Sequence, residues 1–285
     1  MKVTRRHFLQ GVLGTGAAAA GGWGYMKWAE ADWFETTVTP CATGRTSAET
    51  PLRVLHLSDM HASDVVPLVM IARAVALGVE TKPDVIILTG DFWTDRFHLI
   101  NAYADVLRPL SDVAPTFAVA GNHDGGDWAK LGGGWWDLDP LRELLDGAGI
   151  RLLWNEAVTI DVGARPVSLC GVGDWWAGDC APFRTFKSAG DRQADSLRLV
   201  LNHNPDAKED FANYDWDVMF CGHTHGGQLK VPLIGSTPFA PVRDHDFVAG
   251  LNQWNGRHIF TTRGVGNLHG LRFNCRPEVS LLLVS

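Results

Sequence analysis

The sequence predicts an α/β fold whose strands deliver polar clusters to one edge of a sheet. Short apolar runs at 52–58, 85–88 and 116–120 alternate with segments of helical periodicity. Each run ends in Asp, Asn or His, and reactive residues of α/β sheets collect beyond the carboxyl ends of the strands. With 285 residues and 46% hydrophobic content, the chain can bury one sizeable core.

The remaining elements are predicted in chain order. Apolar residues at helical spacing predict helices over 65–80, 99–110 and 138–145. From residue 151 the pattern changes to closely spaced strands, and 175–190 reads as irregular. The strands are expected at 152–160, 167–170, 197–201, near 218, and then at 229–231, 258–262 and 279–284.

The N-terminal residues read as a leader. Thr4-Arg5-Arg6-His7-Phe8-Leu9 resembles the twin-arginine export signal, and an uncharged Ala/Gly-rich stretch follows over 11–24. The resemblance implies export by the twin-arginine translocase to the periplasm or the outer face of the cytoplasmic membrane. Cleavage near 18–20 and retention as a membrane anchor both stay open. We therefore divide the chain into a leader (1–30), a linker or early edge strand (31–50) and one domain (51–285).

Composition excludes several classes of function. The formal charge of −7 disfavours nucleic acid as a partner, because sequence-independent binding needs clustered Lys and Arg. The five cysteines are scattered and lack C-x-x-C spacing, so neither a thiolate zinc site nor a disulfide framework is predicted. A single bridge between Cys170 and Cys180 remains open and unsupported.

Five short polar clusters together predict a site for two metal ions. Carboxylate, amide and imidazole ligands without thiolate suit Mn, Fe, Zn or Ni. A carboxylate can bridge two cations and a neutral imidazole cannot, so we expect one Asp to be shared. Asp91 is the choice, because Gly90 precedes it and it is central in the order of clusters. If the run at 218 is a strand that continues, period two points both His223 and His225 to one side. The clusters are Asp59/His61, Asp91, Asn122/His123, His203 and His223/His225.

The order D-x-H, G-D, G-N-H-D, H-x-P and G-H-T-H resembles the calcineurin-like metallophosphoesterase superfamily over residues 52–285. The run G-H-T-H-G-G-Q, with 262–264 and 272–278, is similar to its small bacterial branch of twin-arginine-exported phosphodiesterases. The resemblance implies a four-layer αββα sandwich, in which two mixed β-sheets flanked by helices hold a dinuclear centre.

Roles for individual residues follow from the same resemblance. His123 is implied to face the scissile phosphate, and Asp124 to orient it. Arg263 and His269 lie in a glycine-rich loop and could contact substrate phosphate. The resemblance assigns Asp59, His61, Asp91 and His225 to one metal and Asp91, Asn122, His203 and His223 to the other.

The function expected is hydrolysis of phosphodiester or pyrophosphate bonds by hydroxide held between the two cations. The substrate would be a small phosphodiester or a nucleotide or lipid phosphate. Tryptophans near the predicted site loops, Trp128 and Trp176 among them, either pack the loops or form an apolar wall for such a substrate. A UDP-2,3-diacylglucosamine-type pyrophosphatase and a non-catalytic metal-binding scaffold remain as alternatives.

Overall fold

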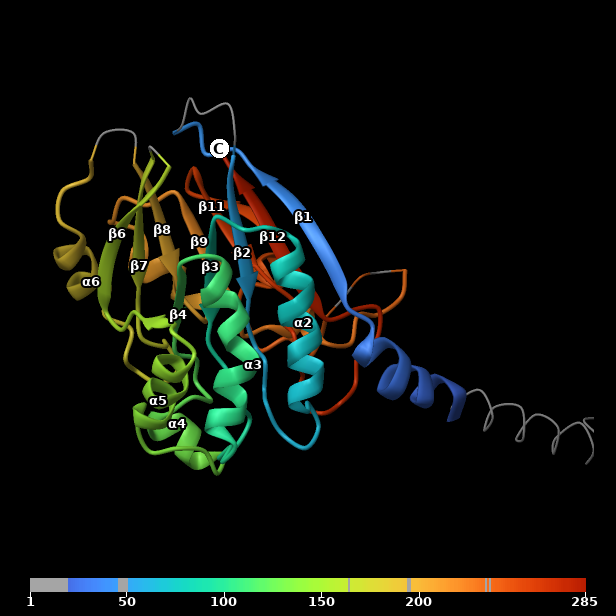
Figure 1. The fold of residues 1–285 in the computed structure, drawn as a ribbon. Coiled ribbons are helices and arrows are strands. Elements are labelled where there is room, and N and C mark those ends of the chain that lie inside the picture. The colour runs from blue at the N-terminus through green and yellow to red at the C-terminus, as the bar shows by residue number, and fades with distance from the viewer. Residues whose placement is uncertain (1–19, 46–50, 164, 194–195, 234, 236) are drawn as a thin grey trace, which may run out of the picture.

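Two six-stranded mixed β-sheets lie face to face, with helices on the outer side of each (Figure 1). The computed structural model describes residues 20–45, 51–163, 165–193, 196–233, 235 and 237–285. The central strands of both sheets are predominantly apolar and buried, so each sheet needs a covering layer on both faces. The four-layer αββα sandwich implied by the sequence is therefore confirmed.

The first sheet carries three of the predicted strands at its centre. Its order is β1-β12-β2-β3-β4-β5, and all neighbours are parallel except β12 and β2. The β-branched and leucine-rich composition of these strands suits a sheet covered on both faces. The strands are β1 (Glu35–Cys41), β2 (Leu52–Leu57), β3 (Val85–Thr89), β4 (Thr116–Val119), β5 (Arg151–Leu152) and β12 (Glu278–Val284).

The second sheet has a parallel centre and antiparallel edges. Its order is β10-β11-β9-β8-β7-β6, in which β10 with β11 and β6 with β7 are the antiparallel pairs. The strands are β6 (Glu156–Val162), β7 (Arg165–Gly171), β8 (Leu197–Leu201), β9 (Val218–Cys221), β10 (Gly250–Trp254) and β11 (Arg257–Thr261).

The helices cover the outer faces and leave the space between the sheets to side chains. α2 (Leu68–Glu80), α3 (Ile100–Val113) and α5 (Asp139–Gly147) pack on the first sheet, and α6 (Pro182–Ala189) packs on β6 and β7. The short α4 (Gly126–Leu131) follows β4.

A separate core between the sheets joins them. Val54 and Ile87 from the first sheet and Leu199 and Phe220 from the second belong to it, and none is exposed. This packing fixes the position of one set of strand ends relative to the other.

Four parts of the sequence-based assignment were wrong or incomplete. The run at 152–160 is two strands, because Asn155 has a left-handed backbone and the chain crosses there from the first sheet to the second. The stretch 175–190 contains α6, which begins with Pro182 in its first turn. Leu229 forms only an isolated bridge rather than a strand. The strand β10 was not predicted, because its residues are only partly buried.

Part of the segment at 31–50 belongs to the first sheet. Residues Glu35–Cys41 are an edge strand parallel to β12, so this part is not a linker. The Arg5-Arg6 motif lies outside the described residues. In the described part of the chain, no helix has the length and hydropathy that crossing a membrane requires.

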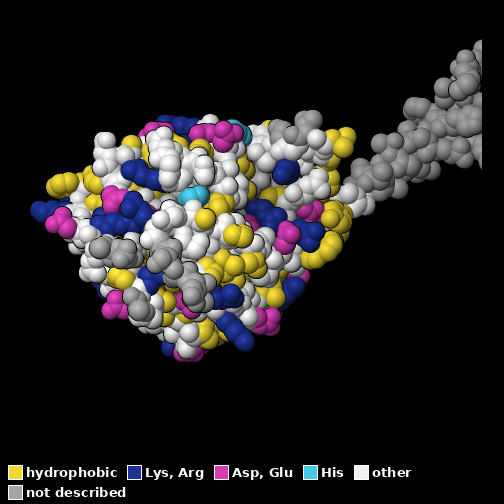
Figure 2. Space-filling view, turned by 90° about the horizontal axis from the view of Figure 1, so that it is seen from above, with side chains coloured by type: hydrophobic (Ala, Val, Ile, Leu, Met, Phe, Trp, Pro, Cys, Tyr) yellow, Lys and Arg dark blue, Asp and Glu magenta, His cyan; other side chains and the backbone are white. Residues whose placement is uncertain are grey.

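The structure places the charged surface residues and the cysteines. Figure 2 shows a face on which Lys and Arg side chains are interspersed with Asp and Glu. Cys170 and Cys180 are both free thiols, so the bridge between them is not formed.

Candidate metal centre

The eight predicted side chains come from loops that follow five strands of both sheets. Seven of them are buried, and His123 is partly exposed. Because the central strands of each sheet are parallel, their carboxyl ends meet at one edge. Asp59 and His61 follow β2, Asp91 follows β3, Asn122 and His123 follow β4, His203 follows β8, and His223 and His225 follow β9.

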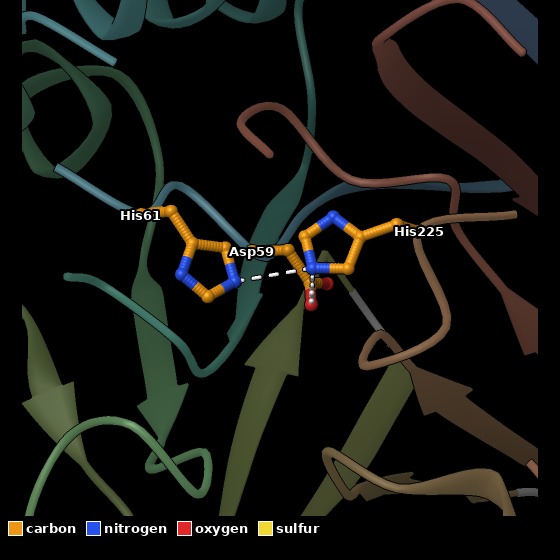
Figure 3. A group of neighbouring side chains, drawn as sticks. All are labelled: Asp59, His61 and His225. Carbon is orange, nitrogen blue, oxygen red and sulfur yellow. Dashed lines mark hydrogen bonds and ion pairs between the residues drawn. The ribbon is translucent and has the colours of Figure 1, made fainter. Parts of the chain in front are cut away.

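The side chains form two groups of potential metal ligands. In the first, the Nε2 atoms of His61 and His225 lie 3.1 Å apart, and His225 Nε2 lies 3.4 Å from Asp59 Oδ1. Figure 3 shows both rings turned toward one another beside this carboxylate. The second group consists of Asp91, His203 and His223, and His223 Nδ1 lies 3.3 Å from His203 Nε2. In each group the ligand atoms lie within 4.8 Å of one another.

Asp91 lies between the two groups. Its Oδ2 atom is 3.2 Å from Nε2 of His203 in its own group and 3.5 Å from Nε2 of His61 in the other. Its Oδ1 atom accepts the backbone N–H of His123 at 2.9 Å, which fixes the orientation of the carboxylate. One oxygen that faces ligands of both groups is the arrangement that a carboxylate shared by two cations requires.

Three of the four ligand imidazoles are held in the neutral form that binds metal. Burial lowers the pKa of His61 and His223 to about 3, and that of His225 well below its usual value. These three rings are therefore neutral at pH 7 and present a lone pair. Burial also disfavours the charge on His203, but Asp91, Asp59 and Asp174 together outweigh burial and raise the pKa of His203 well above the ordinary value. A cation bound there would compete with this proton.

The two buried carboxylates, Asp59 and Asp91, favour binding of positive charge. Burial raises the pKa of Asp59 to about 6. Burial disfavours ionisation of Asp91 too, but His203 and His123 outweigh it and hold its pKa well below the usual value. Among the described residues, neither carboxylate forms an ion pair with Lys or Arg. Buried carboxylates in proteins are paired or coordinate metals, so this site suits cations.

Asn122 provides an independent test of the fit to a metal. Its Oδ1 atom is buried and has no hydrogen-bond partner, although a buried amide oxygen is nearly always satisfied. Amide oxygen is an accepted ligand of divalent cations. The residues present therefore fit two divalent cations, one held by the Asp59 group and one by the Asp91 group, and the element remains a prediction.

The ligand loops have an unusual backbone. Eleven described non-glycine residues have positive φ, and five of them are candidate ligands, at 59, 61, 91, 223 and 225. Such conformations are costly and cluster at functional sites. They also correct the strand argument for the histidine pair, because β9 ends at Cys221 and each ring reaches a different group. Gly222, directly before the histidine pair, has to be glycine, since a Cβ there would lie 2.2 Å from Asp59 Oδ2.

The comparison with known families agrees with this geometry. The calcineurin-like phosphoesterase family matches residues 52–227, which span every candidate ligand. The chain belongs to this family. Six of the seven implied ligands fall into the two groups, and Asn122 is the seventh.

Relatives of this phosphoesterase have been named in several bacteria. The chain is 48% identical to phosphodiesterase YaeI of Escherichia coli, over 98% of each chain. It is 27% identical to the uncharacterized metallophosphoesterase YkuE of Bacillus subtilis, over 98% of this chain and 97% of the relative. UDP-2,3-diacylglucosamine pyrophosphatase LpxG of Chlamydia muridarum is 23% identical, over 81% of this chain and 83% of the relative.

Asp124 has a different role in this phosphoesterase from the one predicted. Its buried carboxylate accepts the backbone N–H groups of Gly121 and Asp91 at 2.7 and 2.8 Å and that of Phe92 at 2.7 Å. The Nδ1 atom of His123 lies instead 3.1 Å from the carbonyl oxygen of Thr94. Asp124 therefore holds the loops of Asp91 and Asn122 together and does not orient His123.

Several other groups orient the ligand rings. Thr94 Oγ1 lies 3.2 Å from Nδ1 of His61, and the carbonyl of Thr89 is within hydrogen-bond reach of Nδ1 of His203. A partner on the second ring nitrogen fixes the tautomer and directs the other nitrogen toward the metal.

Of the two predicted substrate contacts, one lines the site cavity and one does not. His269 lines the cavity, together with Asp91 and His123. Arg263 pairs with Glu35 at 2.9 Å and with Glu278 at 3.1 Å and is not part of the lining. The prediction for Arg263 is therefore wrong, because both carboxylates already engage its guanidinium.

The sequence analysis missed part of the cavity lining. The missed residues lie in loops without a polar motif, and only the large apolar side chains in a glycine- and proline-rich stretch could have indicated them. They are Leu229, Phe239, Pro241 and Leu268.

Proposed function

We propose that this protein hydrolyses small phosphodiesters and that both cations act on the same phosphoryl group. The observation that carries the proposal is the position of Asp91 Oδ2, within 3.5 Å of a histidine of each ligand group. A shared carboxylate holds two cations close enough to contact one phosphate. The family and the name of the 48% identical relative support the same reaction class.

The chain's own residues account for the course of the reaction. When bound, the two cations neutralise phosphoryl oxygens and make water nucleophilic near neutral pH. The oxygen of one water bonds to phosphorus, the ester P–O bond on the opposite side breaks, and the leaving oxygen takes a proton. His123 lines the cavity, and its Nδ1 faces a carbonyl that can only accept. Its Nε2 is therefore the atom that we assign to delivering this proton.

A single assay tests this proposal. Protein loaded with Mn²⁺ should hydrolyse bis(p-nitrophenyl) phosphate faster than p-nitrophenyl phosphate, and EDTA should abolish both rates until Mn²⁺ is restored. Mn²⁺, Fe²⁺, Zn²⁺ and Ni²⁺ tested in parallel would identify the preferred metal. Faster hydrolysis of the monoester would make the protein a phosphatase, and no hydrolysis with any metal would remove the enzymatic proposal.

A pyrophosphatase of the UDP-2,3-diacylglucosamine type is the weaker candidate. Its support is a relative of that name at 23% identity. A pyrophosphate carries a second phosphate, and none of the described residues that line the cavity is Lys or Arg.

For the leader, we propose export by the twin-arginine route and association with the outer side of the cytoplasmic membrane. The helical segment over residues 20–29 extends away from the body of the protein (Figure 1), and Glu30 and Ala31 after it are buried. Trp23 is 50% exposed and Trp28 is 73% exposed. Tryptophan favours the interface between membrane and water, which supports this location.

Export is tested by fusing residues 1–30 to a reporter that folds in the cytoplasm. The reporter should appear in the envelope fraction, and the matched fusion with Arg5→Lys and Arg6→Lys should remain in the cytoplasm. Equal distribution of the two fusions would contradict the proposed route.

A further inference from the structure

The cavity above the candidate metal centre has an apolar wall. Its volume is about 490 Å³, with candidate ligands from both groups, Asp91 and His225 among them, in its lining. Two tryptophans come from the side of α4 and the loop after β7, and the other apolar residues come from loops after β9 and β11. The apolar members of the lining are Trp128, Trp176, Leu229, Phe239, Pro241 and Leu268.

The wall begins directly at a candidate metal ligand. The ring of Trp176 lies edge-on to the imidazole of His223, with centroids 4.3 Å apart, and the ring of Trp128 lies 4.6 Å from that of Trp176. A group esterified to a phosphate at the metals would therefore contact aromatic rings. Trp128 is 39% exposed and Phe239 is 72% exposed, so both offer apolar surface that a ligand can cover.

The cations near this wall are engaged elsewhere. The guanidinium of Arg243 lies over the ring of Trp175, 4.8 Å from its centroid. Lys130 lies 3.7 Å from the ring centroid of Trp136, and Arg263 pairs with two glutamates. Among the described residues, the lining therefore offers neither Lys nor Arg to a second phosphate.

We infer that the substrate is a phosphodiester with a single phosphate and an apolar ester group, alkyl or aromatic, which lies against Trp128, Trp176 and Phe239. This inference rests on the proposed function, because the phosphate of the same substrate occupies the metal centre. It names a subsite beside the metals and a substrate class that excludes nucleotide pyrophosphates.

Binding of simple phosphate monoesters to Mn²⁺-loaded protein tests the subsite without turnover. Each monoester carries only one ester group, so a difference in affinity between two monoesters reports the contacts of that group alone. By isothermal titration calorimetry, hexyl phosphate should bind at least roughly tenfold more tightly than methyl phosphate, since burial of only two methylene groups corresponds to that factor. The difference should be accompanied by a more negative heat-capacity change. Benzyl phosphate, measured in parallel, distinguishes an aromatic ester group from an alkyl one.

Variants of the lining residues test whether the preference for hexyl phosphate arises at the apolar wall. Trp128→Ala and Phe239→Ala should each reduce the ratio of hexyl to methyl affinity by roughly threefold or more. Trp154→Ala is the matched control, because Trp154 is 38% exposed, nearly as much as Trp128, but does not line the cavity. It should leave the ratio unchanged.

Equal binding of hexyl and methyl phosphate, or a ratio that survives both lining variants, would overturn the inference. Tight binding of hexyl phosphate without hydrolysis of bis(p-nitrophenyl) phosphate would retain the subsite and refute the proposed reaction. Hydrolysis of bis(p-nitrophenyl) phosphate with equal binding of the two monoesters would retain the proposed reaction and refute the apolar subsite.

Discussion

Replacement of Asp91 by Asn is expected to reduce diester hydrolysis by roughly 10³-fold or more, because bound cations supply several kcal/mol of charge stabilisation in the transition state. Asp91 Oδ2 faces histidines of both ligand groups, at 3.2 and 3.5 Å. An asparagine offers one neutral oxygen and cannot hold two cations with it. The protein should therefore lose at least one metal, as measured by elemental analysis beside the kcat/KM for bis(p-nitrophenyl) phosphate.

Asp95→Asn provides the control for this variant. Asp95 lies four residues further along the chain, is exposed and does not line the cavity. Its replacement by Asn therefore removes the same charge at a place away from the site. It should retain both metals and normal turnover. If Asp91→Asn behaved in the same way as Asp95→Asn, the two groups of ligands would not share a carboxylate, and the dinuclear centre would have to be abandoned.

Replacement of His123 by Ala is expected to lower kcat by roughly 10²- to 10⁴-fold, the range typical of a positioned acid or base. His123 is not a member of either metal-binding group, so both metals should remain bound. If Nε2 of His123 delivers a proton to the leaving oxygen, the loss should be larger for a dialkyl phosphate than for a nitrophenyl ester, whose leaving group departs without a proton. Kinetics with both esters, combined with metal analysis, would measure this difference.

Asp124→Asn separates this role from the structural one next to it. The Asp124 carboxylate accepts three buried N–H groups, and an amide can satisfy them only in part. This variant should lower the melting temperature and the affinity for metal, whereas His123→Ala should lower only the rate. Full activity of His123→Ala with both metals bound would remove its assigned role.

The sequence was sufficient for the strands that carry the site and for their order. The runs at 52–58, 85–88 and 197–201 are predominantly apolar, and each coincides with a strand to within one residue. Because all five polar clusters lie at strand ends, few arrangements of the strands can bury them together. The structure brings Asp59, His61 and His225 into one group although 164 positions separate the two histidines.

The remaining features depend on contacts between distant segments. Whether a carboxylate ligates metal, orients a histidine or receives backbone N–H groups is not visible in a motif, so Asp124 was assigned wrongly. Arg263 was misassigned because its partner Glu35 lies 228 residues earlier, on the edge strand β1. The crossing between the two sheets depends on one left-handed residue, Asn155, inside an otherwise continuous run.

The left-handed backbone at positions 59, 61, 91, 223 and 225 has an evolutionary consequence. Glycine adopts such conformations at little cost, whereas Asp and His do not. Selection for heat resistance alone should therefore enrich glycine at these five positions. The resulting proteins would be more thermostable and catalytically inactive. Persistence of the five ligands in a laboratory lineage would accordingly report that its growth still depends on the reaction.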